Sequence, residues 1–165
     1  MKKRIPITEY GEDKYKPFFG ILFETDKFYY ITQISHAQQR HQHMKQQKDF
    51  YKIYDTKITN RLLAVVNLNY MFPIPKNETS EFKKSEIDKH RTFKTDTERS
   101  KYINLLNTEI KVINSMDISN AAEEIYTNKY KYPQSKLAQR CLDYKQLEKY
   151  GHKWIIHSRC RDKDS

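Results

Sequence analysis

The chain has 165 residues, with 31 Lys and Arg against 21 Asp and Glu, and its formal net charge is +10. Residues 1–165 are about long enough for one domain. No apolar run reaches the roughly 18 residues of a membrane span, and the N-terminus lacks the apolar stretch of a secretory signal. Two cysteines, Cys141 and Cys160, are too few for a disulfide scaffold and lack metal-ligand spacing. We therefore expect a cytoplasmic protein with no membrane partner.

The excess of positive charge has two ordinary explanations, an anionic polymer as partner or solubility alone. The 13 tyrosines add large rings that carry a polar hydroxyl, so a modest core with an aromatic-rich surface is expected. Composition does not decide between the two explanations.

The first third of the chain contains two strand-like runs. Residues 1–16 are charged with little periodicity and are expected to form an arm over the domain. Residues 17–24 and 28–34 are rich in β-formers and are separated by a short polar turn, which predicts a β-hairpin. Residues 36–49 are polar all round, which is typical of a solvated helix, a loop or a surface that meets a partner.

A third strand is predicted over residues 62–68. It runs into a segment that contains Pro73 and Pro75, and proline restricts such a segment to a sheet edge or a strand exit. Residues 76–94 are mostly charged and polar and read as a long connection.

Helical periodicity dominates the rest of the chain. Thr95 and Glu98 have the spacing of a capping box that opens a helix. The residues expected to face the core from this helix are Tyr102, Leu105, Leu106, Ile110 and Ile113. Asp117 can cap a second helix, which Pro133 ends. A third helix carries Leu137, Cys141, Tyr144 and Leu147 on one stripe.

Gly151 is the expected end of that third helix, which leaves residues 151–165 as a C-terminal tail. Strands come first and helices later, so the predicted fold class is α+β in a single domain, with helices concentrated in the C-terminal half.

The densest group of polar side chains follows the second predicted strand. Its members are Thr32, Ser35, His36, Arg40, His41, His43 and Lys45. Metal-free RNA cleavage needs a base for the 2′-hydroxyl, cations for the phosphorane charge and an acid for the departing 5′-oxygen. Histidine suits the proton transfers, and arginine can hold two phosphate oxygens. Unpaired bases could stack on the neighbouring Tyr29 and Tyr30.

Other interpretations of this segment stay open. A polar stretch with three histidines is most often a solvated surface, and His36, His41 and His43 could instead form a zinc site. Asn67 and Asn69 could read nucleic-acid edges, or they could make hydrogen bonds at a strand end.

Five pieces of the chain occur in the order typical of one family. They are Pro17–Leu22, Tyr30–His41, Asn67–Pro75, Tyr102–Leu106 and Cys141–Glu148. Together they resemble the ToxN/AbiQ family, the endoribonuclease toxins of type III toxin–antitoxin systems. The resemblance covers residues 17 to about 150.

The resemblance implies a compact, twisted antiparallel β-sheet core flanked by helices. It also implies an endoribonuclease that cuts RNA without metal or other cofactor and leaves 2′,3′-cyclic phosphate and 5′-hydroxyl ends. The implied partners are the substrate mRNA and a structured antitoxin RNA. The antitoxin RNA consists of repeats, and the toxin itself processes it. Toxin and antitoxin RNA are expected in a ring-shaped or dimeric assembly that serves phage defence by abortive infection. The alternatives are a non-catalytic RNA-binding module and a zinc-dependent hydrolase.

The chain departs from the family pattern at the expected site. Many members carry a hydroxyl residue followed by Ser-Pro-x-Lys or Ser-Pro-Lys, where this chain has Ile34, Ser35, His36 and Ala37. Ser35 carries over, and the lysine is missing. The predicted catalytic residues are therefore Ser35, His36, Arg40 and His41, with base and acid unassigned between the two histidines. The predicted RNA-binding residues are Tyr29, Tyr30, Thr32, His43, Lys45, Asn67 and Asn69, and no metal ligand is expected.

Overall fold

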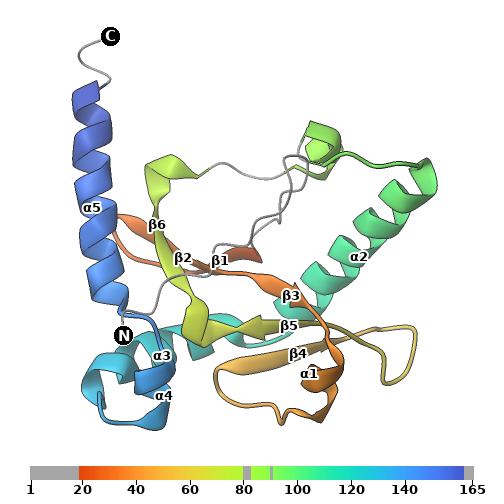
Figure 1. The fold of residues 1–165 in the computed structure, drawn as a ribbon, viewed down its shortest axis with the longest axis horizontal. Coiled ribbons are helices and arrows are strands. Elements are labelled where there is room, and N and C mark those ends of the chain that lie inside the picture. Colours follow the sequence, from red (N-terminus) through yellow and green to blue (C-terminus); the bar gives the residue numbers. More distant parts are fainter. Residues whose placement is uncertain (1–18, 80–82, 90, 162–165) are drawn as a thin grey trace.

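The computed structural model describes residues 19–79, 83–89 and 91–161 (Figure 1). The arm expected over residues 1–16 lies outside these residues. Strands β1 (Phe19–Glu24) and β2 (Phe28–Thr32) pair antiparallel, which confirms the predicted hairpin. Strand β6 (Phe72–Pro75) pairs with the other side of β2 and ends the sheet in the order β1-β2-β6. Its two prolines thus lie in an edge strand, as their missing N–H groups require.

A second antiparallel sheet has the order β3-β5-β4. It contains β3 (Ile34–His36), β5 (Leu62–Asn67) and β4 (Phe50–Tyr54). The predicted third strand is β5, whereas β4 was not predicted. The fold class is therefore α+β as expected, with the strands divided between two small sheets.

The expected strand over residues 28–34 is split between these sheets. The chain leaves the first sheet after Thr32 and enters the second at Ile34. The buried Thr32 hydroxyl donates a hydrogen bond of 2.8 Å to the Asn67 carbonyl oxygen at the end of β5. This bond ties the two sheets together where the chain crosses between them.

Short helices occupy the polar connections. Helix α1 (Gln39–His43) follows β3, and the 3₁₀ helix η1 (Leu68–Tyr70) joins β5 to β6. The long polar connection contains η2 (Lys76–Glu78) and η3 (Lys84–Lys89). The connection is anchored by the side chain of Ile87, which is 1% exposed.

Helix α2 (Asp96–Asn114) begins at its predicted cap. The Thr95 hydroxyl accepts from the Glu98 N–H at 3.1 Å, and the Glu98 carboxylate accepts from the Lys94 N–H. Of the residues expected to face the core, Leu106 and Ile113 are buried, and Tyr102, Leu105 and Ile110 are half-buried. Expecting all of them in the core was wrong, because α2 packs only part of its apolar stripe.

Helix α3 (Ile118–Lys131) ends before Pro133, as predicted. Asp117 occupies the N-cap position, but its side chain makes no capping hydrogen bond. Ile118, Ala122 and Ile125 are buried on one stripe of this helix. These residues are three to four positions apart, the spacing of one face of a helix.

The predicted third helix is two helices, α4 (Lys136–Arg140) and α5 (Tyr144–Arg161). Gly151 was expected to end a helix and instead lies inside α5, which continues into the segment expected as a tail. A Cβ at Gly151 would lie 2.6 Å from Cε1 of the buried Phe28. The glycine is therefore explained by a close approach to β2, and its role as a helix stop was a wrong prediction.

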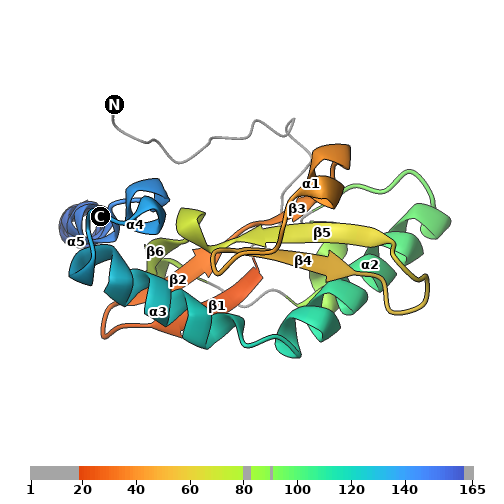
Figure 2. The ribbon, with the colours of Figure 1, turned by 90° about the horizontal axis from the view of Figure 1, so that it is seen from below.

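Helices α2 and α3 lie on one side of the β3-β5-β4 sheet, and α1 lies on the other (Figure 2). The core forms on the side of α2 and α3, where Ile53, Ala64 and Val66 cluster with Ile113 and Ile118. The opposite side of this sheet carries α1 (Figure 2).

A cluster of tyrosines closes the core between the first sheet, α3 and α5. Tyr30 is fully buried and contacts Phe23, Tyr126 and Tyr144. Its hydroxyl donates to the Glu148 carboxylate at 2.7 Å. Burial, followed by the Glu148 carboxylate, raises the pKa of Tyr30 far above its usual range. Tyr30 therefore stays protonated and keeps this hydrogen bond.

Within the described part of the chain, no helix is long and apolar enough to cross a membrane.

Candidate active site

The pairing of β3 decides which side chains share a face of the sheet. Ser35 pairs with Val65, and Val65 pairs with Lys52 on the other side of β5. Directly paired residues in antiparallel strands project to the same face. Ser35 and Lys52 therefore lie on the face under α1. His36 follows Ser35 in the strand and projects to the opposite face.

Helix α1 is short, and His41 is the buried residue within it. The His41 side chain is 6% exposed and packs 6.1 Å, between ring centroids, from Phe50 of β4. Phe50 lies two residues before Lys52, so it projects to the same face of the sheet. His41 is thereby held on the face that carries Ser35.

Both ring nitrogens of His41 face N–H donors. The Gln38 backbone N–H donates to Nδ1 at 3.1 Å, and Nε of Arg40 donates to Nε2 at 3.3 Å. A neutral imidazole carries its proton on one nitrogen and accepts at the other, so it keeps one of these contacts as a hydrogen bond, whereas a doubly protonated imidazolium would keep neither.

The surroundings of His41 disfavour its charged form. Burial, followed by the positive charges of Arg40 and Lys52, lowers the pKa of His41 below its usual value of about 6.5. The ring is therefore neutral at physiological pH, and a neutral imidazole can accept a proton.

The other polar residues of this segment are open to solvent. His36, Arg40, His43 and Lys45 are all exposed. No acidic side chain occurs in residues 36–48. The buried His41 therefore lies beneath a surface of cationic and neutral side chains.

The two adjacent tyrosines differ in environment. Tyr29 is half-buried, and the Lys76 ammonium lies 5.1 Å from its ring centroid. Tyr30 points into the core, and no face of its ring is open to a base. We leave Tyr30 out of the RNA surface because strand alternation assigns it to the core.

Three other predicted RNA-binding residues lie near the junction of the two sheets. Thr32 is 1% exposed and uses its hydroxyl to hold the Asn67 carbonyl. Asn69 is 8% exposed, and its buried side-chain oxygen has no hydrogen-bond partner among the described residues. Thr32 and Asn69 are thus withdrawn from the surface, and the half-buried Asn67 remains accessible.

The histidines form no recognisable metal centre. Among the described residues, no group of three or more His, Cys, Asp or Glu side chains could hold a metal ion. His36 and His41 project from different elements and, by strand alternation, lie on different sides of the sheet.

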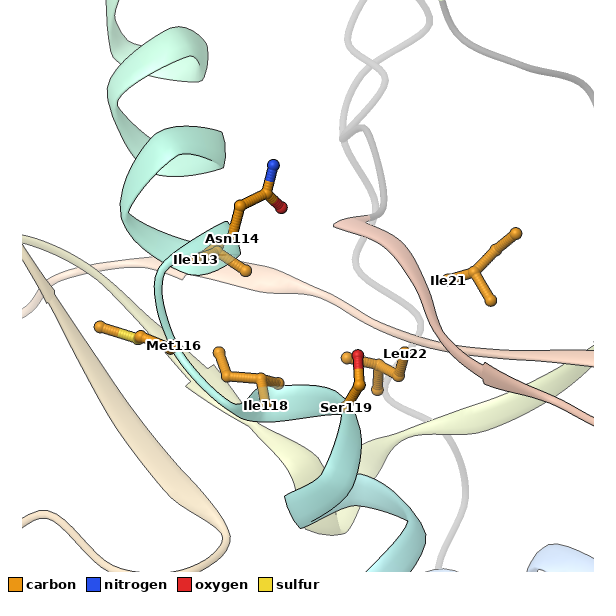
Figure 3. Close-up of a pocket in the computed structure, with 7 residues that line it drawn as sticks. All are labelled: Ile21, Leu22, Ile113, Asn114, Met116, Ile118 and Ser119. Carbon is orange, nitrogen blue, oxygen red and sulfur yellow. The ribbon is translucent and has the colours of Figure 1, made fainter.

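A pocket of about 390 Å³ lies elsewhere, between β1 and the turn from α2 to α3 (Figure 3). Its lining is mostly apolar, with Ile21, Ile113, Met116 and Ile118, and its polar side chains are Asn114 and Ser119. None of the residues that line it titrates near neutral pH. It therefore offers no group for acid–base chemistry.

Lys52 is the charged residue that the sequence reading missed. It is 8% exposed, and its ammonium donates to the Gln42 carbonyl of α1 at 2.8 Å. Alternation in residues 50–54 would have placed Phe50 and Lys52 on one face. Because no strand is predicted over these residues, the sequence analysis does not place Lys52 on this face.

One comparison with known proteins identifies a family. A family model described as the toxin ToxN of type III toxin–antitoxin systems matches residues 2–152. A comparison with curated proteins gives no significant sequence match.

Three solved structures share the fold. The first comes from work on a bacterial antiviral system regulated by a processed non-coding RNA. Its identity is 17% and its TM-score 0.68, over 90% of this chain and 85% of that chain. The second is AbiQ, a lactococcal anti-phage endoribonuclease of the type III system, at 15% identity and a TM-score of 0.65, covering 84% and 79%. The third comes from work on selective inhibition of a type III toxin by a non-coding RNA pseudoknot. It has 20% identity and a TM-score of 0.65, covering 87% and 82%.

Proposed function

Because the chain belongs to the ToxN family of type III toxin–antitoxin toxins, we propose that it is an endoribonuclease that cleaves RNA without a metal ion. The observation that carries this proposal is the neutral, buried His41 on the same sheet face as Ser35, next to the exposed Arg40. The fold it shares with AbiQ, which is described as an endoribonuclease, supports the same class of reaction.

In the proposed reaction, His41 is the base. Its Nε2 takes the proton of the 2′-hydroxyl, whose oxygen then bonds to the adjacent phosphorus. The bond from phosphorus to the 5′-oxygen breaks, and the departing oxygen takes a proton from solvent. The products are a 2′,3′-cyclic phosphate and a 5′-hydroxyl, so atoms and charge balance without a metal.

Arg40 has two roles in this scheme. In the free protein its Nε covers His41 Nε2. An arriving phosphate attracts the guanidinium, because a charge-assisted bond to phosphate is stronger than one to a neutral imidazole. This movement uncovers Nε2 and brings a positive charge to the oxygens of the phosphorane. Ser35 orients the 2′-hydroxyl or the phosphate from the neighbouring strand.

The RNA surface of the proposal consists of the predicted RNA-binding side chains that are accessible in the structure. Tyr29 offers a ring for stacking, His43 and Lys45 contact phosphates, and Asn67 reads a base edge. We also propose that a structured, repeat-derived antitoxin RNA occupies this surface, is processed by the toxin and assembles with it into a ring or dimer. The non-coding RNA regulators described for two similar structures support such a partner. Phage defence is the expected role.

The experiment compares two histidine variants of the purified protein on one RNA. His41→Gln should lower the cleavage rate by about 10²-fold or more, the usual size of a lost acid–base contribution. His36→Gln should have a much smaller effect, because His36 projects to the opposite face. Unfolding curves of both variants should match the wild type. Wild-type cleavage by His41→Gln, or an equal loss in His36→Gln, would contradict the assignment.

A further inference from the structure

Lys52 occupies an unusual position for a lysine. It lies in the middle of β4, directly across β5 from Ser35, and is 8% exposed. Lysine is rarely buried this far, because removing its ammonium from water costs free energy unless a partner compensates. Within the described residues, no carboxylate pairs with it. Lys52 is thus a buried cation that has no carboxylate partner in the part of the chain that the structure describes.

The ammonium of Lys52 makes a hydrogen bond that reaches the candidate active site. Its Nζ donates to the carbonyl of Gln42, the residue after His41 in α1. Helix α1 has only five residues and little backbone bonding of its own to fix its position. The bond therefore attaches the short helix to the sheet beside the proposed base.

We propose that Lys52 is a positioning residue of this site, whose ammonium fixes α1 through the Gln42 carbonyl and places an unneutralised positive charge beside the His41 imidazole. The inference rests on the proposed role of His41 as the base. The quantity that it predicts, however, is the pKa of the His41 imidazole, which can be measured without RNA cleavage. Among the described residues, Arg40 contacts that imidazole from α1 and the uncharged Phe50 packs against it from β4, while the charge of Lys52 acts on it from its position at the Gln42 carbonyl.

The charge has a measurable consequence. A cation near the ring opposes protonation, and Lys52 is one of the causes that lower the pKa of His41. Removing the ammonium should therefore raise the pKa of His41, because one like charge that opposes protonation is gone. The acidic limb of the cleavage rate should move to higher pH by the same amount.

The test uses Lys52→Met, which keeps an unbranched apolar stem and removes the ammonium, and Lys52→Arg, which keeps the charge. Lys52→Gln is a second neutral variant that retains a donor for the Gln42 carbonyl. Lys57→Met removes an equal charge from an exposed position after β4 and is the matched control. The His41 ring signal is followed by NMR against pH in the full-length protein and is assigned with His41→Gln. The rate of RNA cleavage is measured over the same pH range.

The expected result is a higher His41 midpoint in Lys52→Met and Lys52→Gln, and a wild-type midpoint in Lys52→Arg and Lys57→Met. An unchanged midpoint in both neutral variants, or an equal rise in Lys57→Met, would overturn the inference. If either neutral variant unfolds, the other provides the measurement. A shifted midpoint with an unshifted rate profile would support the role of Lys52 beside His41 and contradict only the proposal that His41 is the base.

Discussion

Gly151 has no side chain, and this allows α5 to pack closely against Phe28 of β2. Glycine inside a helix usually costs about 1 kcal/mol relative to alanine, so an exposed Gly→Ala change would stabilise the protein. Here the added Cβ would lie 2.6 Å from Cε1 of Phe28, a ring that is 2% exposed. Steric overlap in a packed core outweighs the gain in helix propensity.

Gly151→Ala should therefore lower the free energy of unfolding by about 1–3 kcal/mol, the usual cost of overpacking. Urea unfolding followed by circular dichroism measures it. The control is the same substitution in a Phe28→Leu background, where Cε1 and Cζ are absent and the added cost should shrink. A Gly151→Ala protein as stable as the wild type would show that α5 does not approach β2 this closely.

The sequence predicts the segment in which the candidate site residues lie, but it does not predict which of their side chains lie on the same face of the sheet. The sequence shows His36 and His41 as equivalent candidates, because spacing alone does not say which face of a strand or helix is covered. Burial of His41 depends on Phe50, which belongs to a strand that was not predicted. Tyr30 was misassigned for a similar reason, since its burial is set by Tyr126 and Tyr144, far away in the sequence.

At the scale of elements, α4 is attached to the sheet by one ion pair. Arg140 contacts both carboxylate oxygens of Asp49 at 2.8 Å, and Asp49 is 4% exposed just before β4. A buried carboxylate that loses its partner keeps its desolvation cost. The pair therefore contributes more than surface ion pairs do.

Arg140→Ala should lower the free energy of unfolding by about 1–3 kcal/mol, because Asp49 would be left without its cation. Lys48→Ala is the matched control. It removes a neighbouring pair of similar length, 2.9 Å to Glu124, whose side chains are 74% and 53% exposed. Its effect should be far smaller. Equal effects of the two substitutions in thermal unfolding would count against a structural role for the Asp49 pair.

The elements that the sequence predicted are those with strong local signals. The capping residues of α2, the hairpin of β1 and β2 and the edge strand with two prolines were all anticipated. The break between α4 and α5 was not, since Leu142 bonds to the Asn69 carbonyl rather than continuing a helix. That bond joins residues 73 positions apart, and no local pattern reveals it.

For the whole molecule, part of the net charge of +10 lies in the acid-free segment of residues 36–48. The segment around α1 contains no acidic side chain, and it lies on the opposite side of the β3-β5-β4 sheet from α2 (Figure 2). RNA bound there would release counterions from its phosphates, so its affinity should fall with salt. Composition alone could not distinguish this from solubility, because it does not say where the charge lies.

Lys45→Gln should weaken RNA binding and reduce the slope of log affinity against log salt by about 0.7, as expected for one phosphate contact with a single strand. Lys101→Gln removes the same charge from an exposed position on α2 and should leave the slope unchanged. Fluorescence anisotropy with a labelled RNA, in the His41→Gln background to prevent cleavage, gives both slopes. Equal slopes for the two variants would place the RNA elsewhere.

The most direct test of the central claim is cleavage of a defined RNA by the purified protein in excess EDTA, with the chemistry of both new ends determined. We predict fragments with 2′,3′-cyclic phosphate and 5′-hydroxyl ends, at a rate that chelator does not reduce and that His41→Gln lowers by about 10²-fold or more. Binding without new ends would contradict the claim in favour of a non-catalytic RNA-binding module. Activity lost to EDTA and restored by zinc would contradict it in favour of a metal-dependent hydrolase.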